Sequence, residues 1–72
     1  METISQIVDS IQDLRQQVID NKGYDWYINT TLPYQWNTVL TINRMAIAGT
    51  IKDDLARQEL STIRCEFDVV VN

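Results

Sequence analysis

The sequence contains no histidine, so it lacks the side chain that most often acts as a general base or binds a transition metal. Its single cysteine, Cys65, cannot form a disulfide within the chain, which fits a reducing compartment. No apolar run approaches the roughly 18 residues of a membrane span, and no basic region precedes an apolar core at the N-terminus. We therefore expect a cytoplasmic protein that is not an enzyme and holds no cofactor or metal.

Basic residues are scarce, with six Lys and Arg against ten Asp and Glu and a net charge of −4. Nucleic acids and anionic membranes are bound by clustered bases, so we expect no direct contact with either. A basic protein partner would suit the acidic balance, although mild acidity also keeps small domains soluble. With 72 residues and 44% hydrophobic side chains, we expect one small domain spanning residues 1–72.

Residues 3–21 show the plainest helical period in the chain. The apolar positions recur at a spacing of three and four residues, which places them on one face of a helix: Ile4, Ile7, Ile11, Leu14 and Val18. Asp9, Asp13 and Asp20 fall on the opposite face. The apolar seam is too short to indicate a coiled coil between chains, so we expect it to pack inside the domain.

Three later segments favour strands. Residues 24–31 and 61–71 alternate between two faces and are rich in β-forming side chains. Residues 35–43 fit a strand better than a helix, because their polar side chains would surround a helix and several are β-branched. The alternative for this segment is a helix that begins at Pro33, with Thr31 as its cap, and runs toward Gly49.

A second helix is expected after Gly49, where Thr50 can cap and Asp53 can return the hydrogen bond. The predicted fold is therefore α+β, in the order α-β-β-α-β, with a small, mainly antiparallel three-stranded sheet and both helices on one face. This order resembles, in layout only, a ferredoxin-like split βαβ unit that lacks its first strand. The second-ranked prediction is a mostly α-helical hairpin with a C-terminal strand.

The predicted function is that of a small, non-enzymatic interaction protein, an accessory or inhibitor-type adaptor that binds another protein. The expected contacts for this partner are Asp9, Asp13, Asp20, Tyr27 and Tyr34. We also expect a homo-oligomer, because an open sheet edge can accept a strand from a neighbouring chain. Its expected interface is the apolar C-terminal segment Val69, Val70 and Val71.

Two other functions remain open at this level. A small ligand or nucleotide could bind a pocket between protomers that is lined by aromatic side chains and by Arg44 or Arg64. The chain could instead be a structural subunit of a larger assembly. Small size and mild acidity also suit an accessory protein of a phage or mobile element, but composition does not decide the source.

Overall fold

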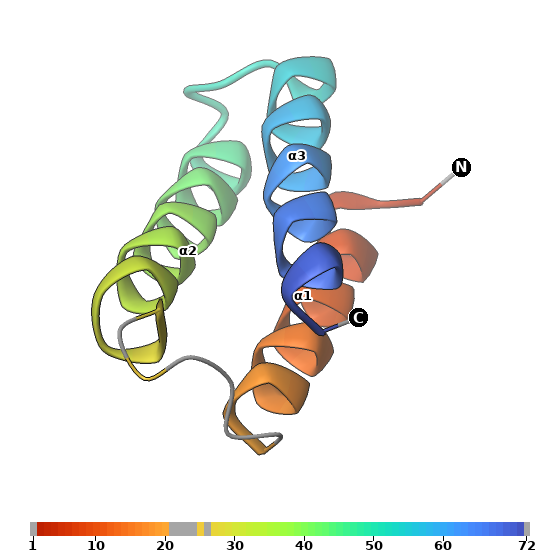
Figure 1. Ribbon diagram of the computed structural model, residues 1–72. Helices are drawn as coiled ribbons and strands as arrows, with labels where there is room; N and C mark the ends of the chain where they lie inside the picture. Colours follow the sequence, from red (N-terminus) through yellow and green to blue (C-terminus); the bar gives the residue numbers. More distant parts are fainter. Residues whose placement is uncertain (1, 21–24, 26, 72) are drawn as a thin grey trace.

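The computed structural model describes residues 2–20, 25 and 27–71, and its elements are helical throughout (Figure 1). Helix α1 (Ile4–Asp20) is followed by a π-helical turn η1 (Tyr27–Thr31), then by α2 (Leu32–Ala48) and α3 (Asp53–Val71). The described residues include no strand, so the α+β prediction is wrong. The C-terminal strand of the second-ranked prediction is wrong for the same reason.

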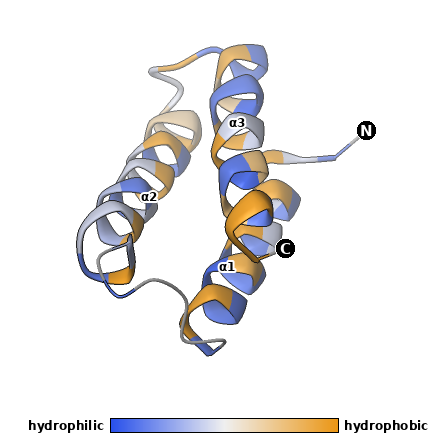
Figure 2. Cartoon of the chain, viewed as in Figure 1, coloured by the Kyte–Doolittle hydropathy of each residue, from blue (hydrophilic) through white to orange (hydrophobic). Residues whose placement is uncertain are grey.

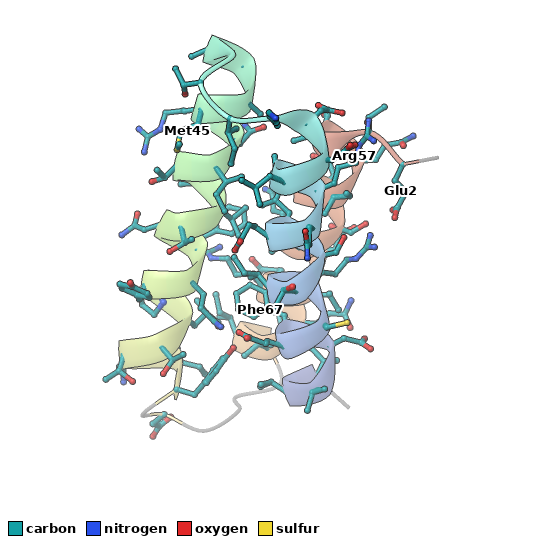
Figure 3. The ribbon with its side chains drawn as sticks, turned by 90° about the horizontal axis from the view of Figure 1, so that it is seen from above. Glu2, Met45, Arg57 and Phe67 are labelled. Atoms are coloured by element: carbon teal, nitrogen blue, oxygen red, sulfur yellow. The ribbon has the colours of Figure 1, made fainter. Side chains whose placement is uncertain are left out.

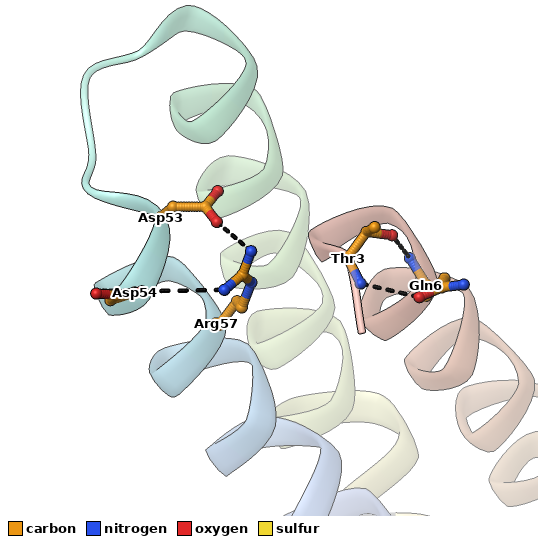
Figure 4. A network of polar contacts seen from close by, with 5 residues as sticks. All are labelled: Thr3, Gln6, Asp53, Asp54 and Arg57. Atoms are coloured by element: carbon orange, nitrogen blue, oxygen red, sulfur yellow. Dashed lines mark hydrogen bonds and ion pairs between the residues drawn. The ribbon is translucent and has the colours of Figure 1, made fainter. Parts of the chain in front are cut away.

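Helix α1 confirms the helix predicted from the apolar period of residues 3–21. It begins with a reciprocal cap in which the Thr3 amide donates to Gln6 Oε1 at 2.9 Å and the Gln6 amide donates to Thr3 Oγ1 at 3.1 Å (Figure 4). This pair satisfies two of the backbone N–H groups that every helix start leaves open. Ile7, Ile11 and Val18 are buried, so the apolar seam packs inside the domain as predicted.

The predicted strand at residues 24–31 falls partly outside the described residues, because 21–24 and 26 are not described. Where the segment is described, η1 forms instead and leads directly into α2. Thr31 occupies the cap position of α2 but has helical φ and ψ angles of −75° and −44°, and its side chain makes no capping hydrogen bond. Pro33 lies in the first turn of α2, where its missing N–H has no helical partner to lose.

The segment predicted as a strand at 35–43 is the middle of α2, so the alternative of a Pro-started helix running toward Gly49 is confirmed. Gly49 ends α2 in the left-handed conformation, with φ of 76°. The amides of Gly49 and Thr50 donate to the carbonyls of Ala46 and Met45 at 3.2 and 2.9 Å, and Thr50 Oγ1 also donates to Met45. Thr50 therefore caps the end of α2 and not the start of α3, contrary to our prediction.

Helix α3 begins with two acids, Asp53 and Asp54, which a helix N-terminus favours. Arg57, one turn later, forms ion pairs with both (Figure 4). The predicted strand at 61–71 is the second half of this helix. Ile63 and Phe67 do belong to the core, but they are one helical turn apart and continue the apolar side of Ala56 and Leu60.

The core lies where the three helices meet, and Phe67 occupies its interior (Figure 3). Helix α1 packs most extensively against α3, while α2 makes fewer contacts with either of them. The Cα atoms span 36 × 23 × 14 Å, so the bundle is flattened. Since packed helix axes lie about 8–10 Å apart, a body this thin leaves one side of each helix uncovered.

Candidate interaction surface

Charge is distributed very unevenly among the three helices. Helix α1 carries three acids and one base, and α3 carries five acids and two bases, whereas Arg44 is the one charged residue in the sequence of α2. Figure 2 shows hydrophilic and hydrophobic residues on different sides of α1 and α3, and a more mixed pattern along α2. Helix α2 is thus the least charged of the three α-helices.

Large apolar side chains are exposed on α2. Ile47 is 79% exposed, Tyr34 is 74% exposed, and Met45, at the C-terminal end of the helix, is 37% exposed (Figure 3). Single exposed apolar residues are ordinary on protein surfaces, but several on one nearly uncharged helix make that helix a candidate for contact with another molecule. We call the exposed residues Tyr34, Arg44, Met45 and Ile47 the α2 surface.

A stripe of residues runs along the side of α2 nearest α1. Trp36, Leu40 and Asn43 are half-buried in it, and Ile47 is exposed. Their spacing of four, three and four residues is that of the seam positions in a coiled coil. We call these four residues the α2 stripe.

An open groove of about 270 Å³ lies at the C-terminal end of the α2 stripe. Asn43, Ala46 and Ile47 line it from α2, and Ile4 and Ser5 line it from the first turn of α1. Its volume is below the roughly 300–1,000 Å³ of typical small-ligand pockets, and it is not enclosed. The groove suits the side chains of a docking helix better than a small molecule.

At the N-terminal end of the α2 stripe, α1 and α2 are in contact. The guanidinium carbon of Arg15 lies 5.1 Å from the ring centroid of Trp36, a distance that permits a cation–π interaction. Arg15 Nε is buried and has no hydrogen-bond partner. Both side chains are half-buried, so this stacked pair fills the space between α1 and α2 at that end of the stripe.

The predicted contact residues of α1 lie where the helical period placed them. Asp9, Asp13 and Asp20 are exposed on the solvent side of α1, away from the buried Ile7, Ile11 and Val18. Gln16 donates a hydrogen bond of 2.9 Å to Asp20 one turn later. We call these three aspartates the acidic face. It lies on a different helix from Tyr34, so the predicted contact set is not a single patch.

Tyr27 is not an exposed contact residue. It is only 8% exposed, and its hydroxyl donates a hydrogen bond of 2.9 Å to Gln35 Oε1. Gln35 Nε2 in turn donates to Glu66 on α3. Burial, together with the nearby Glu66 carboxylate, raises the pKa of Tyr27. The tyrosine therefore joins η1, α2 and α3, while Tyr34 remains available on the α2 surface.

The two arginines proposed for a ligand site lie on different helices. Arg44 is exposed on α2, whereas Arg64 projects from α3 and donates a hydrogen bond of 2.8 Å to Glu2. This hydrogen bond lowers the pKa of Glu2 and raises that of Arg64. Arg64 also lines a second open cavity, of about 260 Å³, with Leu14, Cys65 and Asp68 and without an aromatic side chain. The pair does not converge within one chain.

The C-terminal segment is helical, so the predicted oligomer interface cannot act by adding a strand. Val69 is 76% exposed on α3, while Val70 and Val71 are partly buried and pack against the core. Cys65, on the same helix, is an exposed thiol.

Among the described residues, no group of three or more Cys, Asp or Glu side chains is placed to hold a metal ion. No described helix is long and apolar enough to cross a membrane. Comparisons with protein-family models, with curated proteins and with solved structures found no match. The surface of the molecule is therefore the only basis for a functional proposal.

Proposed function

We propose that this chain is a non-enzymatic interaction protein and that it docks against another protein molecule through the α2 surface. One observation carries the proposal: large apolar side chains are exposed on the helix that has a single charged residue. Exposed apolar groups on such a helix gain free energy when a partner removes them from water.

The residue types of α2 also match those of protein interfaces. Interface cores are depleted in charged residues and enriched in aromatic residues, methionine and arginine. Helix α2 supplies Tyr34, Trp36, Arg44 and Met45, and none of these is an acid. Helix α2 therefore has the residue types of an interface core.

In this proposal the acidic face of α1 does not form the central contact. Its aspartates are solvated, and exposed charge pairs contribute about 0–1 kcal/mol each to an association. The acidic face instead repels other acidic surfaces and so limits which partners can approach. We place the protein in the cytoplasm, because a reducing compartment preserves an exposed thiol such as Cys65.

The test is crosslinking in the native host, followed by mass spectrometry of everything bound, the chain itself included. Ile47→Glu places a charge on the α2 surface, and Val69→Glu is its control, since both residues are β-branched and exposed to nearly the same extent (79% and 76%). We expect the main crosslinked partner to disappear with Ile47→Glu and to persist with Val69→Glu.

A second variant, with Asp9→Lys and Asp13→Lys together, separates the α2 surface from the acidic face. We expect this variant to keep the partner that Ile47→Glu loses. Loss of the partner on reversing the aspartates, with retention in Ile47→Glu, would move the docking surface to α1 and refute the proposal.

A further inference from the structure

We infer that the molecule covering α2 is a second copy of this chain, paired helix to helix along the α2 stripe. The inference rests on the proposed function and names a partner for the same helix: the α2 stripe shares Ile47 with the α2 surface, whereas Tyr34 and Met45 lie on another side of α2. Three features of the described residues carry it: the distribution of charge, the spacing of the stripe and the shape of the groove beside it.

Charge decides which faces of two copies can meet. Each copy has a net charge of −4, so two copies repel each other wherever their acids approach. Contact through α1 would oppose Asp9, Asp13 and Asp20 of both copies, and α3 contributes five acids of its own. Helix α2 has no acid, so two copies can approach through α2 without bringing carboxylates together.

The α2 stripe supplies a seam that can interlock with a copy of itself. Trp36, Leu40, Asn43 and Ile47 follow the seam spacing over three helical turns. Trp36 and Leu40 are only half-buried within one copy, and Ile47 is exposed. A second α2 laid along the stripe would remove their remaining surface from water.

An antiparallel arrangement fits the residues of the stripe better than a parallel one. It opposes Trp36 to Ile47 of the second copy and Leu40 to its Asn43, around a twofold axis between residues 41 and 42. It also keeps the two Arg44 side chains about 7 Å apart along the helix axis, at 1.5 Å per residue, whereas a parallel pair would place them side by side. Opposed helix dipoles favour the same arrangement.

The groove and the size of the surface agree with this pairing. The open groove lined by Ile4, Ser5 and Ile47 would receive side chains from the second α2, so the α1 and α2 helices of both copies would form a four-helix arrangement. A stable interface buries about 800 Å² on each partner. That is about one sixth of the 4899 Å² accessible surface of the chain, which one side of a flattened bundle can supply.

Sedimentation equilibrium of the purified full chain between 1 and 200 µM tests the inference. We expect a dimer of twice the 8.4 kDa chain mass in the wild type. Ile47→Glu should weaken dimerisation by about 100-fold or more, because each dimer would bury two unpaired charges, each opposite Trp36 of the other copy. Val69→Glu should leave it unchanged, and far-UV circular dichroism checks that both variants remain helical.

A second variant acts in the opposite direction. Asn43→Leu replaces the polar member of the stripe, and a polar residue in such a seam lowers its stability. We expect this variant to tighten the dimer by about tenfold. Orientation is tested with Cys65→Ser chains. Chains carrying Leu40→Cys should crosslink with chains carrying Asn43→Cys, whereas Ile47→Cys chains should not crosslink with each other.

The results that would overturn self-pairing through α2 differ from those that would overturn the proposed function. A wild type that stays at 8.4 kDa up to 200 µM overturns self-pairing, while the proposed function is still judged by the crosslinked partner in the host. A dimer that Val69→Glu disrupts and Ile47→Glu spares overturns pairing through α2 and places the interface on α3. A disulfide between two Ile47→Cys chains overturns the antiparallel arrangement, since their Cα atoms would be about 16 Å apart along the axis.

Discussion

Helix α1 buries one apolar side and exposes its aspartates on the other, and α3 does much the same, although it also exposes Leu55 and Val69. Helix α2, in contrast, carries apolar side chains on its buried and on its exposed sides and has a single charged residue. Helices α1 and α3 pack extensively against each other, and α2 contributes Leu32, Val39 and Ile42 to the same core. The outer side of α2 still presents Tyr34 and Ile47 to solvent. This difference indicates two roles: the α1–α3 pair holds the fold together, and α2 both completes the fold and supplies a surface for another molecule.

The largest expected effect comes from truncating the core of the α1–α3 pair. Phe67→Ala should lower the free energy of unfolding by about 3–5 kcal/mol, because it removes a fully buried ring and leaves a cavity. A domain of this size has about 5 kcal/mol in total, so the variant should keep only about 0–2 kcal/mol of stability. Urea titration followed by circular dichroism measures the change.

Ile47→Ala is the comparison on α2. In a single copy it should change the free energy of unfolding by less than about 0.5 kcal/mol, since the side chain is already exposed. Its effect should grow with protein concentration if α2 pairs with a second copy, because association stabilises the folded state. The effect of Phe67→Ala should not grow with protein concentration. Equal effects of the two truncations at low concentration would erase the distinction between the helices.

The next effect concerns the end of α2. Gly49→Ala should cost about 1–2 kcal/mol, because alanine is strained at a φ of +76°. Nothing lies within 4 Å of the added Cβ, so the loss would come from the backbone and not from a clash. Gly49→Asn is the matched control and should lose less, as asparagine tolerates this conformation. Thermal unfolding of the three proteins ranks them, and a rank of Asn below Ala would contradict this account of the α2 end.

A smaller effect is expected where η1, α2 and α3 meet. Tyr27→Phe removes the hydrogen bond to Gln35 and should cost about 1 kcal/mol. Tyr34→Phe, the exposed control on α2, should cost nothing measurable. Urea titration at pH 7 compares the two, and equal stability of both variants with the wild type would show that the Tyr27 hydroxyl contributes nothing.

The same tyrosine predicts a loss of stability in alkali. Its pKa is raised in the folded protein above the ordinary value of 10.0, so folding favours the protonated form. This contribution is present below pH 10.0 and is lost as the pH rises through the folded pKa. Tyr27→Phe should therefore flatten the decline of stability above pH 10.0, and Tyr34→Phe should not.

The smallest effect concerns the ion pair between Glu2 and Arg64. The pKa of Glu2 is lowered from its ordinary value of 4.5 by the hydrogen bond from Arg64, so its contribution is present above pH 4.5 and is lost as the pH falls through the lowered pKa. Glu2→Gln should make acid unfolding slightly less steep. In an Arg64→Gln background the same substitution should have no effect, and a thermal-unfolding series from pH 6 to 2 measures both.

The contrast between the helices also explains which parts of the fold the sequence predicts. In α1 one face is apolar and the other acidic, so the period alone locates the helix, the core residues Ile7 and Ile11, and the exposed aspartates. The cap formed by Thr3 and Gln6 was not predicted. Its signature is nevertheless present in the sequence: a threonine, then a glutamine three residues later, before an apolar run.

The sequence favours a strand at residues 35–43, within α2, because the apolar residues of this helix lie on two of its sides. A helix that contacts its own core on one side and solvent or a partner on another has no single apolar face, so its period is blurred. The β-branched residues Thr38, Val39, Thr41 and Ile42 then favoured a strand, but helix propensities differ by less than about 1 kcal/mol per residue and packing overrides them. The decisive signals were Pro33 at the start and Gly49 at the end.

In α3 the residues fit both periods. Ile63, Phe67 and Val71 match an alternating strand and also lie one helical turn apart. No glycine or proline separates residues 53 and 71, so the helix predicted after Gly49 had no reason to stop. The contacts of Tyr27 were not predictable locally, because its partner Gln35 bonds in turn to Glu66, which is distant in sequence.

Because Arg15 stacks on Trp36, the fluorescence of this tryptophan can report on the space between α1 and α2. With Trp26→Phe, Trp36 becomes the sole indole, and its emission shifts to longer wavelength whenever water gains access to the space between α1 and α2. Dilution of the chain should produce a red shift if the second copy seals the indole. A fluorescence titration could therefore follow the assembly without any label.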